Sequence, residues 1–504
     1  MRPSHLALGA LLSLPACAPA ARNATGTTPP TAGRDAISQS DIGIRDDSAT
    51  IASILAEGMR GRRTTEDLRH LTDVIGPRLT GSDGMRRAGE WMAGRLRGAG
   101  ADSVWLEPVR ISRGWARGPI SLRLVAPHQR WLQGASIAWA PGTGGELEGD
   151  VVHVDAGTER EFRARFAGKL RGAWVMTRAP MPMFDQFRPS AADSARVRDA
   201  RVALLAPPAD SAGQRYLTAR DSLLAAEGIA GTITSSDKDR GLLTMFGSPR
   251  SIRARPGVIV SHETFAELHR LLAGGERVRL AARIENRFMG EAVSHNVIAE
   301  LRGAAAPDEM VILGAHLDSW DLATGATDNG AGVVAVTEAL RLIASGGTRP
   351  ARGVRVVLFT GEEQGLLGST AYVAAHAAEL ARVQAVIVVD NGSGRISGIA
   401  LQGREDLRGV WERLFRPLAP LGPFTVEQRV RTGSDHLPFL RAGVPAYLVN
   451  QEFKSYDWTW HTQADGYDNI VAADLPQIAT VLAGVAWGLA NAERLIPRDA
   501  PPAR

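Results

Sequence analysis

Apolar runs alternate with helical segments from about Val293 onward in this 504-residue chain, and this alternation constrains its fold more than any other feature. The runs are short and rich in Val, Ile and Leu, which is typical of strands buried on both faces. Strands that alternate with helices indicate an α/β fold with a mixed, largely parallel sheet flanked by helices. The predicted strands cover residues 310–315, 356–361 and 386–389, and the predicted helices cover residues 332–344, 371–380 and 475–490.

Five residues with metal-binding side chains fall at the ends of such runs: His316, Asp328, Glu363, Asp390 and His461. Catalytic groups gather where the strands of such a sheet end. Two imidazoles and three carboxylates suffice for two zinc ions about 3.5–4 Å apart if one carboxylate bridges them. We expect Asp328 to bridge, because the small residues that follow it let the backbone approach the metals. The sequence thus predicts two Zn²⁺ per chain.

Two further carboxylates have predicted roles beside the metals. Glu362 and Glu363 are adjacent at the turn after a predicted strand, where neighbouring side chains point in different directions. One of the two carboxylates can therefore bind metal while the other stands over the metal-bound water. Asp318 lies two residues after His316, and we expect its carboxylate to accept a hydrogen bond from the other ring nitrogen of that histidine.

These residues lie in six short segments that carry a family resemblance. The segments are His316-Leu317-Asp318-Ser319, Asp328-Asn329-Gly330-Ala331-Gly332, Gly361-Glu362-Glu363-Gln364-Gly365-Leu366-Leu367-Gly368-Ser369, Asp390-Asn391-Gly392, Gly433-Ser434-Asp435-His436 and His461-Thr462. Together they resemble the M28 family of co-catalytic zinc exopeptidases, whose α/β fold is of the phosphorylase/hydrolase type. Within that family the chain is most similar to the carboxypeptidase Q (plasma glutamate carboxypeptidase) group.

The resemblance assigns a role to each candidate ligand. It implies that His316 and Asp390 hold one zinc. It implies that Glu363 and His461 hold the other, with Asp328 as the bridge. By the same resemblance, Glu362 is the general base.

Pocket residues near these segments each have two interpretations. Some aminopeptidases of the family have a tyrosine three residues before the Ser-Asp-His sequence, where this chain has Arg431. That arginine either stabilises an oxyanion or binds a substrate carboxylate, or it makes a structural ion pair. His436, next to Asp435, either lines the pocket or caps the short helix that follows. Trp460 either forms a wall of the pocket or packs structurally.

The expected reaction is hydrolysis of short peptides that have a free terminus, by a metal-bound water. A carboxypeptidase or dipeptidase preference is favoured over an aminopeptidase one. Two other classes share the fold: a glutaminyl-cyclase-like transferase and a non-enzymatic receptor module. The first resembles a single-zinc site and the second is expected to have lost ligands, so the complete set of five argues for the exopeptidase.

The start of the chain has the pattern of an export signal. Residues 1–21 combine a charged start and a short apolar core with a sequence that resembles a bacterial lipobox, Leu14-Pro15-Ala16-Cys17. Cys17 is the single cysteine. We expect lipid attachment there, and the alternative is cleavage near Ala18 to Ala20 with Cys17 discarded. The sequence therefore predicts a cell-envelope lipoprotein of the periplasm or outer membrane, or a secreted protein, with residues 22–48 as a flexible tether.

The rest of the chain is predicted to form a peptidase domain with an insertion. Residues 49–111 and 287–498 make up the peptidase domain, and residues 112–286 resemble a β-rich protease-associated domain inserted into it. The alternative is an irregular elaboration without its own core. A net charge of +4, three lysines and no basic cluster exclude nucleic acid as an expected partner. The oligomeric state stays open, with a homodimer as one alternative.

Overall fold

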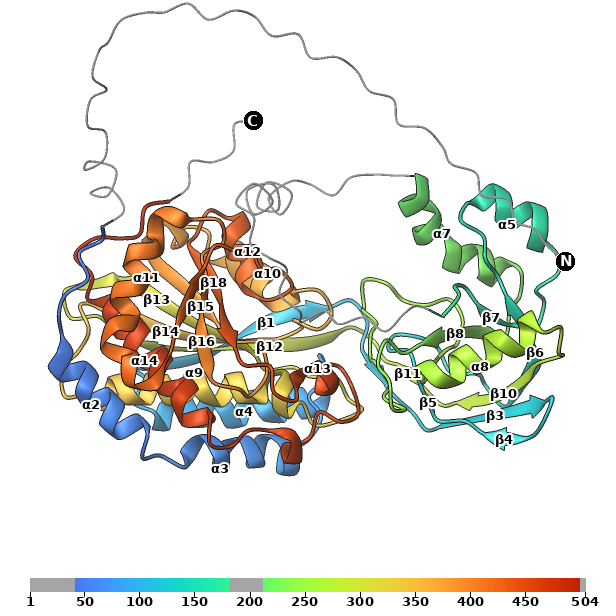
Figure 1. Ribbon diagram of the computed structural model, residues 1–504, viewed down its shortest axis with the longest axis horizontal. Coiled ribbons are helices and arrows are strands. Elements are labelled where there is room, and N and C mark those ends of the chain that lie inside the picture. Colours follow the sequence, from blue (N-terminus) through green and yellow to red (C-terminus); the bar gives the residue numbers. More distant parts are fainter. Residues whose placement is uncertain (1–40, 181–211, 499–504) are drawn as a thin grey trace, which may run out of the picture. The chain divides into compact units, whose positions relative to one another are not determined.

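The computed structural model describes residues 41–180 and 212–498 (Figure 1). The predicted signal, Cys17 and most of the predicted tether lie outside the described residues. Within these two ranges, no helix combines the length and the apolar character needed to cross a membrane.

One large mixed sheet carries the predicted α/β fold. Among the described residues it has eight strands, in the order β1-β12-β14-β13-β15-β18-β16-β17. The central strands β14, β13, β15 and β18 pair in parallel, whereas β1, β12 and β14 pair antiparallel at one side. The strands are β1 (Ser103–Ile111), β12 (Ala292–Leu301), β13 (Ala306–His316), β14 (Arg352–Phe359), β15 (Val383–Val388), β16 (Ile396–Ala400), β17 (Thr425–Glu427) and β18 (Ala446–Gln451).

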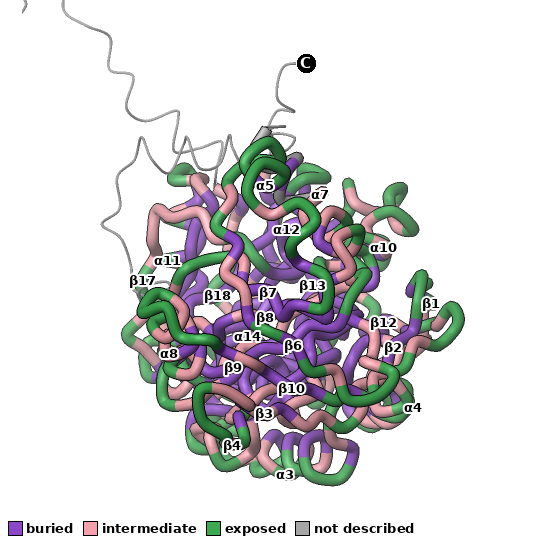
Figure 2. Tube along the Cα trace, turned by 90° about the vertical axis from the view of Figure 1, so that its right-hand side faces the viewer, coloured by how far each residue is buried: buried purple, intermediate pink, exposed green. Residues whose placement is uncertain are grey.

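Helices cover both faces of this sheet (Figure 1). Successive side chains of β13 pack on opposite faces: Val311 and Leu313 join one core cluster, and Ile312 joins another. Side chains of six helices join the first cluster: α2 (Ser48–Gly58), α3 (Arg63–Arg69), α4 (Asp83–Gly98), α9 (Ala331–Ala344), α11 (Arg408–Phe415) and α14 (Leu475–Ala490). Side chains of α10 (Leu367–Ala375) and α12 (His436–Arg441) join the second. Figure 2 shows the resulting buried interior in purple.

Short helical segments complete this part of the chain. They are η1 (His70–Ile75), η2 (Ala326–Gly330), η3 (Leu380–Arg382), η4 (Glu405–Leu407), η5 (Arg416–Leu421), α13 (Tyr456–Thr459) and η6 (Tyr467–Asn469).

A second sheet is built from residues between Ile120 and Ile284, within the predicted insertion. It has its own buried core, to which Leu124, Val151 and Trp174 contribute. The alternative of an elaboration without a core is therefore wrong, while the boundaries at residues 112 and 286 stay a prediction. The sheet order is β4-β3-β10-β6-β7-β8-β9-β5. Its strands are β3 (Ile120–Ala126), β4 (Arg130–Trp131), β5 (Gly134–Ser136), β6 (Leu147–His153), β7 (Trp174–Met176), β8 (Gly231–Ser235), β9 (Gly257–Val260) and β10 (Arg279–Ile284).

This region is less purely β than predicted. The helices α5 (Glu159–Phe166), α7 (Ala212–Ala226) and α8 (His262–Ala273) accompany the sheet, and β6, β7, β8 and β9 pair in parallel. A small ribbon of β2 (Trp115–Ala116) and β11 (Arg287–Phe288) lies where the chain enters and leaves the second sheet.

The strands and helices predicted in the second half of the chain are all present, but several ends differ: β13 begins at Ala306 instead of residue 310, and β14 begins at Arg352 instead of residue 356. The helix predicted over residues 371–380 begins four residues earlier, at Leu367, and ends at Ala375. Leu366 precedes it with a left-handed φ of 59°, and a chain in that conformation cannot continue a helix backwards. The turn that contains Glu362 and Glu363 therefore leads directly into α10.

Candidate active site

His316 is the last residue of β13 and faces two carboxylates. Its Nε2 lies 3.1 Å from Oδ1 of Asp328 and 3.1 Å from Oδ1 of Asp390. Its Nδ1 contacts the backbone oxygen of Asp318 at 3.0 Å, and a carbonyl oxygen only accepts, so we assign the ring proton to Nδ1. In the neutral ring, the Nε2 lone pair then points toward two acidic oxygens. A cation between these three side chains resolves that arrangement.

A second cluster shares Asp328 with the first. Nε2 of His461 lies 2.8 Å from Oε2 of Glu363 and 3.5 Å from Oδ2 of Asp328. In each of the two clusters the possible ligand atoms lie within 4.8 Å of one another. Asp328 thus turns one oxygen to each histidine, which is the arrangement a bridging carboxylate requires.

The donor set fits zinc in its chemistry as well as its placement. The Glu363 side chain is 1% exposed, and its carboxylate accepts no hydrogen bond from the described residues. Burial raises the pKa of Glu363 well above its usual value and lowers the pKa of His461 to about 4. A buried carboxylate without donors and a neutral imidazole are both ligands that a divalent cation satisfies.

Burial and neighbouring charge act in opposite directions on the first cluster. Burial opposes the charged form of His316, but the carboxylates of Asp390 and Asp328 outweigh it and raise the His316 pKa well above the usual value. Burial likewise opposes ionisation of Asp328, but hydrogen bonds with His316 and Tyr456 hold its pKa below normal. The protein therefore favours positive charge between these side chains.

Glu362 lines a cavity of about 590 Å³ beside both clusters. Burial raises the pKa of its carboxyl group well above normal. The backbone amides of Glu362 and Glu363 donate to the Asp318 carboxylate, at 3.2 and 3.3 Å, and so orient the turn that carries both glutamates. The Thr80 hydroxyl donates to the same carboxylate at 3.0 Å.

The role predicted for the Asp318 side chain differs from what the structure shows. Its carboxylate oxygen lies 3.8 Å from Nδ1 of His316, beyond hydrogen-bond distance, and the backbone carbonyl of Asp318 makes the contact instead. The reason is the fold of the turn, which directs the side chain toward the amides of the Glu362 turn.

The sequence predicted that all five candidate ligands lie at strand ends, and the structure shows this for three of them. His316, Asp390 and the glutamate pair do follow β13, β15 and β14. Asp328, in contrast, lies in η2 before α9, and His461 lies beyond α13. Two of the five candidate ligands are therefore placed by loops, which need other contacts to hold them.

Two of the predicted pocket residues line the cavity. Trp460 does so while its ring stacks on His461, with centroids 3.7 Å apart. Arg431 also lines it, and its guanidinium donates to Oδ1 of Asn391 at 2.5 Å and to Oδ1 of Asn450 at 3.4 Å. Both hydrogen-bond acceptors of the Arg431 guanidinium among the described residues are neutral amides, so the structure gives no support to the structural ion pair.

His436 and Asp435 are fully buried and are not among the residues that line the cavity. His436 is the first residue of α12, and its Nε2 contacts the backbone oxygen of Arg431 at 3.0 Å. It therefore neither lines the pocket nor caps the helix with its side chain, and burial lowers its pKa to about 4. Burial raises the pKa of Asp435 to about 8.

Three residues that hold the site together were not predicted from the sequence. The Asp465 carboxylate accepts from the amides of Thr327, at 2.6 Å, and Asp328, at 3.1 Å, and so holds the bridging residue. Arg78 is fully buried and donates to the backbone oxygens that flank the same turn. Tyr456 hydrogen-bonds the Asp328 carboxylate. None of the three stands in a motif, and no sequence signal marks them.

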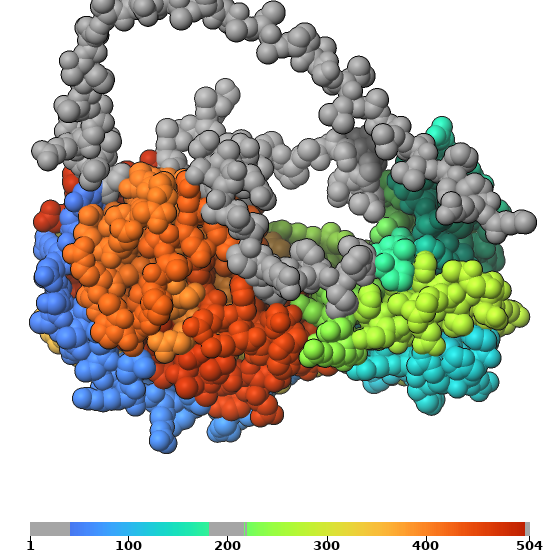
Figure 3. Space-filling model, viewed as in Figure 1, coloured from blue at the N-terminus to red at the C-terminus, as the bar shows by residue number. Residues whose placement is uncertain are grey.

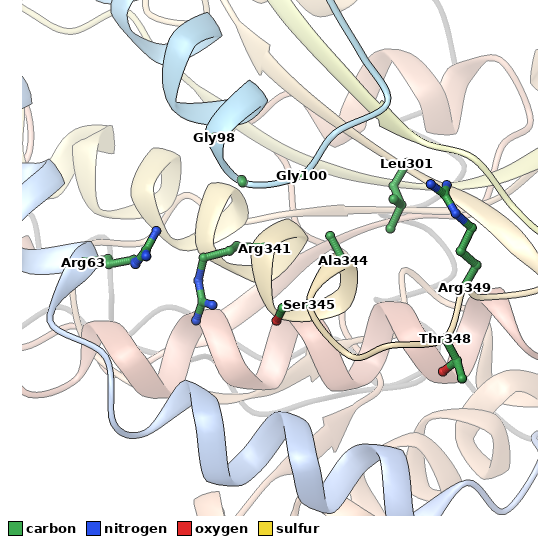
Figure 4. Close-up of a pocket in the computed structure, with 10 residues that line it drawn as sticks. Arg63, Gly98, Gly100, Leu301, Arg341, Ala344, Ser345, Thr348 and Arg349 are labelled. Carbon is green, nitrogen blue, oxygen red and sulfur yellow. The ribbon is translucent and has the colours of Figure 1, made fainter.

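A second cavity, of about 360 Å³, is unsuited to this chemistry (Figure 4). Arginines contribute to its lining, and Arg341 and Arg349 are already paired with acidic side chains. Ser345 follows the C-terminal end of α9, whereas Asp328 precedes its N-terminal end. The 14 residues of α9 separate those ends by about 21 Å at 1.5 Å per residue.

Comparison with known proteins agrees with this geometry. Residues 296–486 match the model of peptidase family M28. The chain is 28% identical to carboxypeptidase Q of Rattus norvegicus over 458 residues, which cover 90% of this chain and 91% of that protein. The family match spans all five candidate ligands, because each lies between residues 296 and 486.

Solved structures of peptidases have a similar fold. The peptidase M28 precursor from Shewanella amazonensis superposes with a TM-score of 0.74 at 26% identity, covering 90% of this chain and 99% of that one. The zinc aminopeptidase BSAP from Bacillus subtilis has a TM-score of 0.60 at 19% identity, covering 84% and 93%, which shows a shared fold.

Proposed function

Because this chain is a zinc metallopeptidase of the M28 family, and carboxypeptidase Q-like, we propose that it is a two-zinc exopeptidase of short peptides. The observation that carries the proposal is the shared Asp328, which turns its two oxygens toward His316 and His461. A single four-coordinate zinc has no use for five ligands. Two clusters with a common carboxylate account for all of them.

In this proposal the protein divides the work among a few side chains. The zinc pair supplies Lewis acidity, which polarises the scissile carbonyl and lowers the pKa of water. Glu362 takes the proton from the attacking water, holds it on its carboxylate and delivers it to the leaving amine. Burial raises the pKa of Glu362, which favours the protonated form that delivers the proton to the leaving amine. The Asp318 carboxylate keeps the Glu362 turn in place through the two amides.

We further propose a carboxypeptidase or dipeptidase preference, which Arg431 supports. Arg431 lines the cavity, and the two side chains to which its guanidinium donates are uncharged amides. A planar guanidinium pairs with a carboxylate through two parallel hydrogen bonds. A peptide C-terminus supplies such a carboxylate, whereas the positively charged amino terminus of a substrate is repelled by the guanidinium.

A peptide panel tests this preference. Metal-replete protein is assayed on free dipeptides, on N-blocked peptides with a free C-terminus and on C-amidated peptides. We expect cleavage of the first two and loss of activity on the third. Arg431→Ala should raise KM more than it lowers kcat, because ground-state binding is lost. Release of aminoacyl reporters together with no cleavage of N-blocked peptides would indicate an aminopeptidase and leave the zinc chemistry intact.

We also propose that the protein is exported and anchored by lipid at Cys17. The support is the signal-like start and the position of the single cysteine in the lipobox-like sequence. Peptide substrates in the cell envelope suit an exopeptidase that acts on short peptides.

A further inference from the structure

The backbone of His461 has a conformation that its surroundings must hold. Its φ is 59°, in the left-handed region that a residue with a side chain seldom adopts. The backbone oxygen of His461 accepts a hydrogen bond from the amide of Met245, at 2.7 Å. Met245 belongs to the inserted region, between β8 and β9. A strained metal-ligand loop is thus tied to a distant part of the chain.

The His461 ring is likewise held by neighbours on both sides. It stacks on Trp460, with centroids 3.7 Å apart, and meets Trp320 edge-on at 5.9 Å. The Lys238 ammonium lies 5.2 Å from the centroid of the Trp460 ring and donates to the backbone oxygen of Asp457 at 2.6 Å. Lys238 is buried, and it is one of three lysines in a chain whose other basic residues are arginines.

A third pair of contacts joins the same two segments. Oε1 of Gln463 accepts from the amide of Leu243 at 2.8 Å, and its Nε2 donates to the oxygen of Gly241 at 3.2 Å. Ser236 stiffens the inserted segment, because its Oγ accepts from the amides of Lys238 and Thr244, each at 3.1 Å. In Figure 3 the green surface of the insertion meets the red surface of the C-terminal part.

We propose that residues 236–250, with Lys238 as the principal positioning residue, set the zinc affinity of the cluster that contains His461. The inference rests on the proposed two-zinc function. The two candidate ligands that belong to the other cluster alone, His316 and Asp390, lie at the ends of β13 and β15 of the large sheet, whose core holds them. His461 lies in a loop beyond α13. The inserted segment bonds its backbone directly through Met245, and its Lys238 contacts Trp460, on which the His461 ring stacks. The insertion therefore controls one metal of the pair and not the other.

Zinc competition against a chromophoric chelator tests this directly. Wild-type protein should bind two equivalents. In Lys238→Met one equivalent should keep its affinity and the other should weaken about 10–100-fold, as is typical when a group that orients a metal ligand is lost. Lys238→Arg keeps a cation beside Trp460 and should restore most of the affinity. Lys169→Met is the matched control, because Lys169 is an exposed lysine of the insertion that contacts only the Arg165 backbone among the described bonds; it should bind as wild type.

Several results overturn the proposal. Equal weakening of both equivalents indicates a general structural role, and unchanged binding in Lys238→Met shows that the segment does not control the site. If Lys238→Met fails to fold by circular dichroism, Gln463→Ala removes a different pair of contacts between the same two segments, those to Leu243 and Gly241, and is judged by the same criterion. Wild-type protein that binds fewer than two equivalents contradicts the proposed function instead, which separates the two failures.

Discussion

Asp328 is the residue on which both clusters depend, because its two oxygens face different histidines. Several hydrogen bonds hold Asp328 in place: Asp465 accepts one from its backbone amide, and Tyr456 makes one to its side chain. Glu362 has a different character. It lines the cavity next to the clusters, and its carboxyl group belongs to neither of them.

This difference between ligand and base leads to a prediction at the residue scale. Glu362→Gln should keep both zinc ions, because it removes no ligand, and should lower kcat by about 10²–10⁴, the usual contribution of a general base. His461→Ala should lose one zinc as well as activity. Elemental analysis and initial rates on the same preparations check both results. A Glu362→Gln protein with nearly wild-type kcat, or one that lacks zinc, contradicts the assignment.

Elements position the site through close packing at their ends. Gly368, near the start of α10, lies where an added Cβ would come within 2.3 Å of both Oδ1 of Asn296 and the backbone oxygen of Thr360. This packing brings the Glu362 turn against the end of β14. Gly94 in α4 is the opposite case, because an added Cβ there meets nothing within 4 Å.

These two glycines give a matched prediction at the element scale. Gly368→Ala should lower the free energy of unfolding by about 1–3 kcal/mol, because overpacked backbone must shift. Gly94→Ala should raise it by about 0.5–1 kcal/mol, because alanine loses less conformational entropy in a helix interior. Urea unfolding followed by circular dichroism measures both. A neutral Gly368→Ala would show that the end of α10 tolerates displacement.

The molecule as a whole combines two sheets, each with its own core, around one site. Contacts to the site come from Arg78 near one end of the described chain, from Met245 in the inserted region and from Asp465 near the other end. The catalytic apparatus is thus a property of the complete chain, and the family match alone covers residues 296–486.

Membrane attachment is the prediction that concerns the whole molecule. In a bacterial host, the wild-type protein should incorporate labelled fatty acid and partition with membranes, because several acyl chains anchor firmly. Cys17→Ser should do neither, and its purified form should keep peptidase activity. Equal labelling of Cys17→Ser, or no labelling of the wild type, would contradict lipid attachment at this cysteine.

Local sequence patterns were sufficient for most of the fold. Runs of apolar residues predicted β13, β14 and β15, and helical periodicity predicted α9 and α14. These predictions succeeded because the signal for each element lies within the element itself. The five candidate ligands were predicted in the same way, since metal binding demands particular side chains. The structure brings those five into two clusters, and their roles in zinc binding stay a prediction.

What the sequence could not determine are the contacts between distant segments. Asp465, Arg78 and the segment around Lys238 have no periodicity and no motif, because their importance comes from which loops meet after the elements pack. The orientation of Asp318 was decided in the same way, by a turn whose amides attract its carboxylate. Sequence alone thus determined which chemistry this chain can perform and on what scaffold. Tertiary structure decided how its two loop-borne candidate ligands, Asp328 and His461, are held in place, because only packing supplies partners that lie more than a hundred residues away in the sequence.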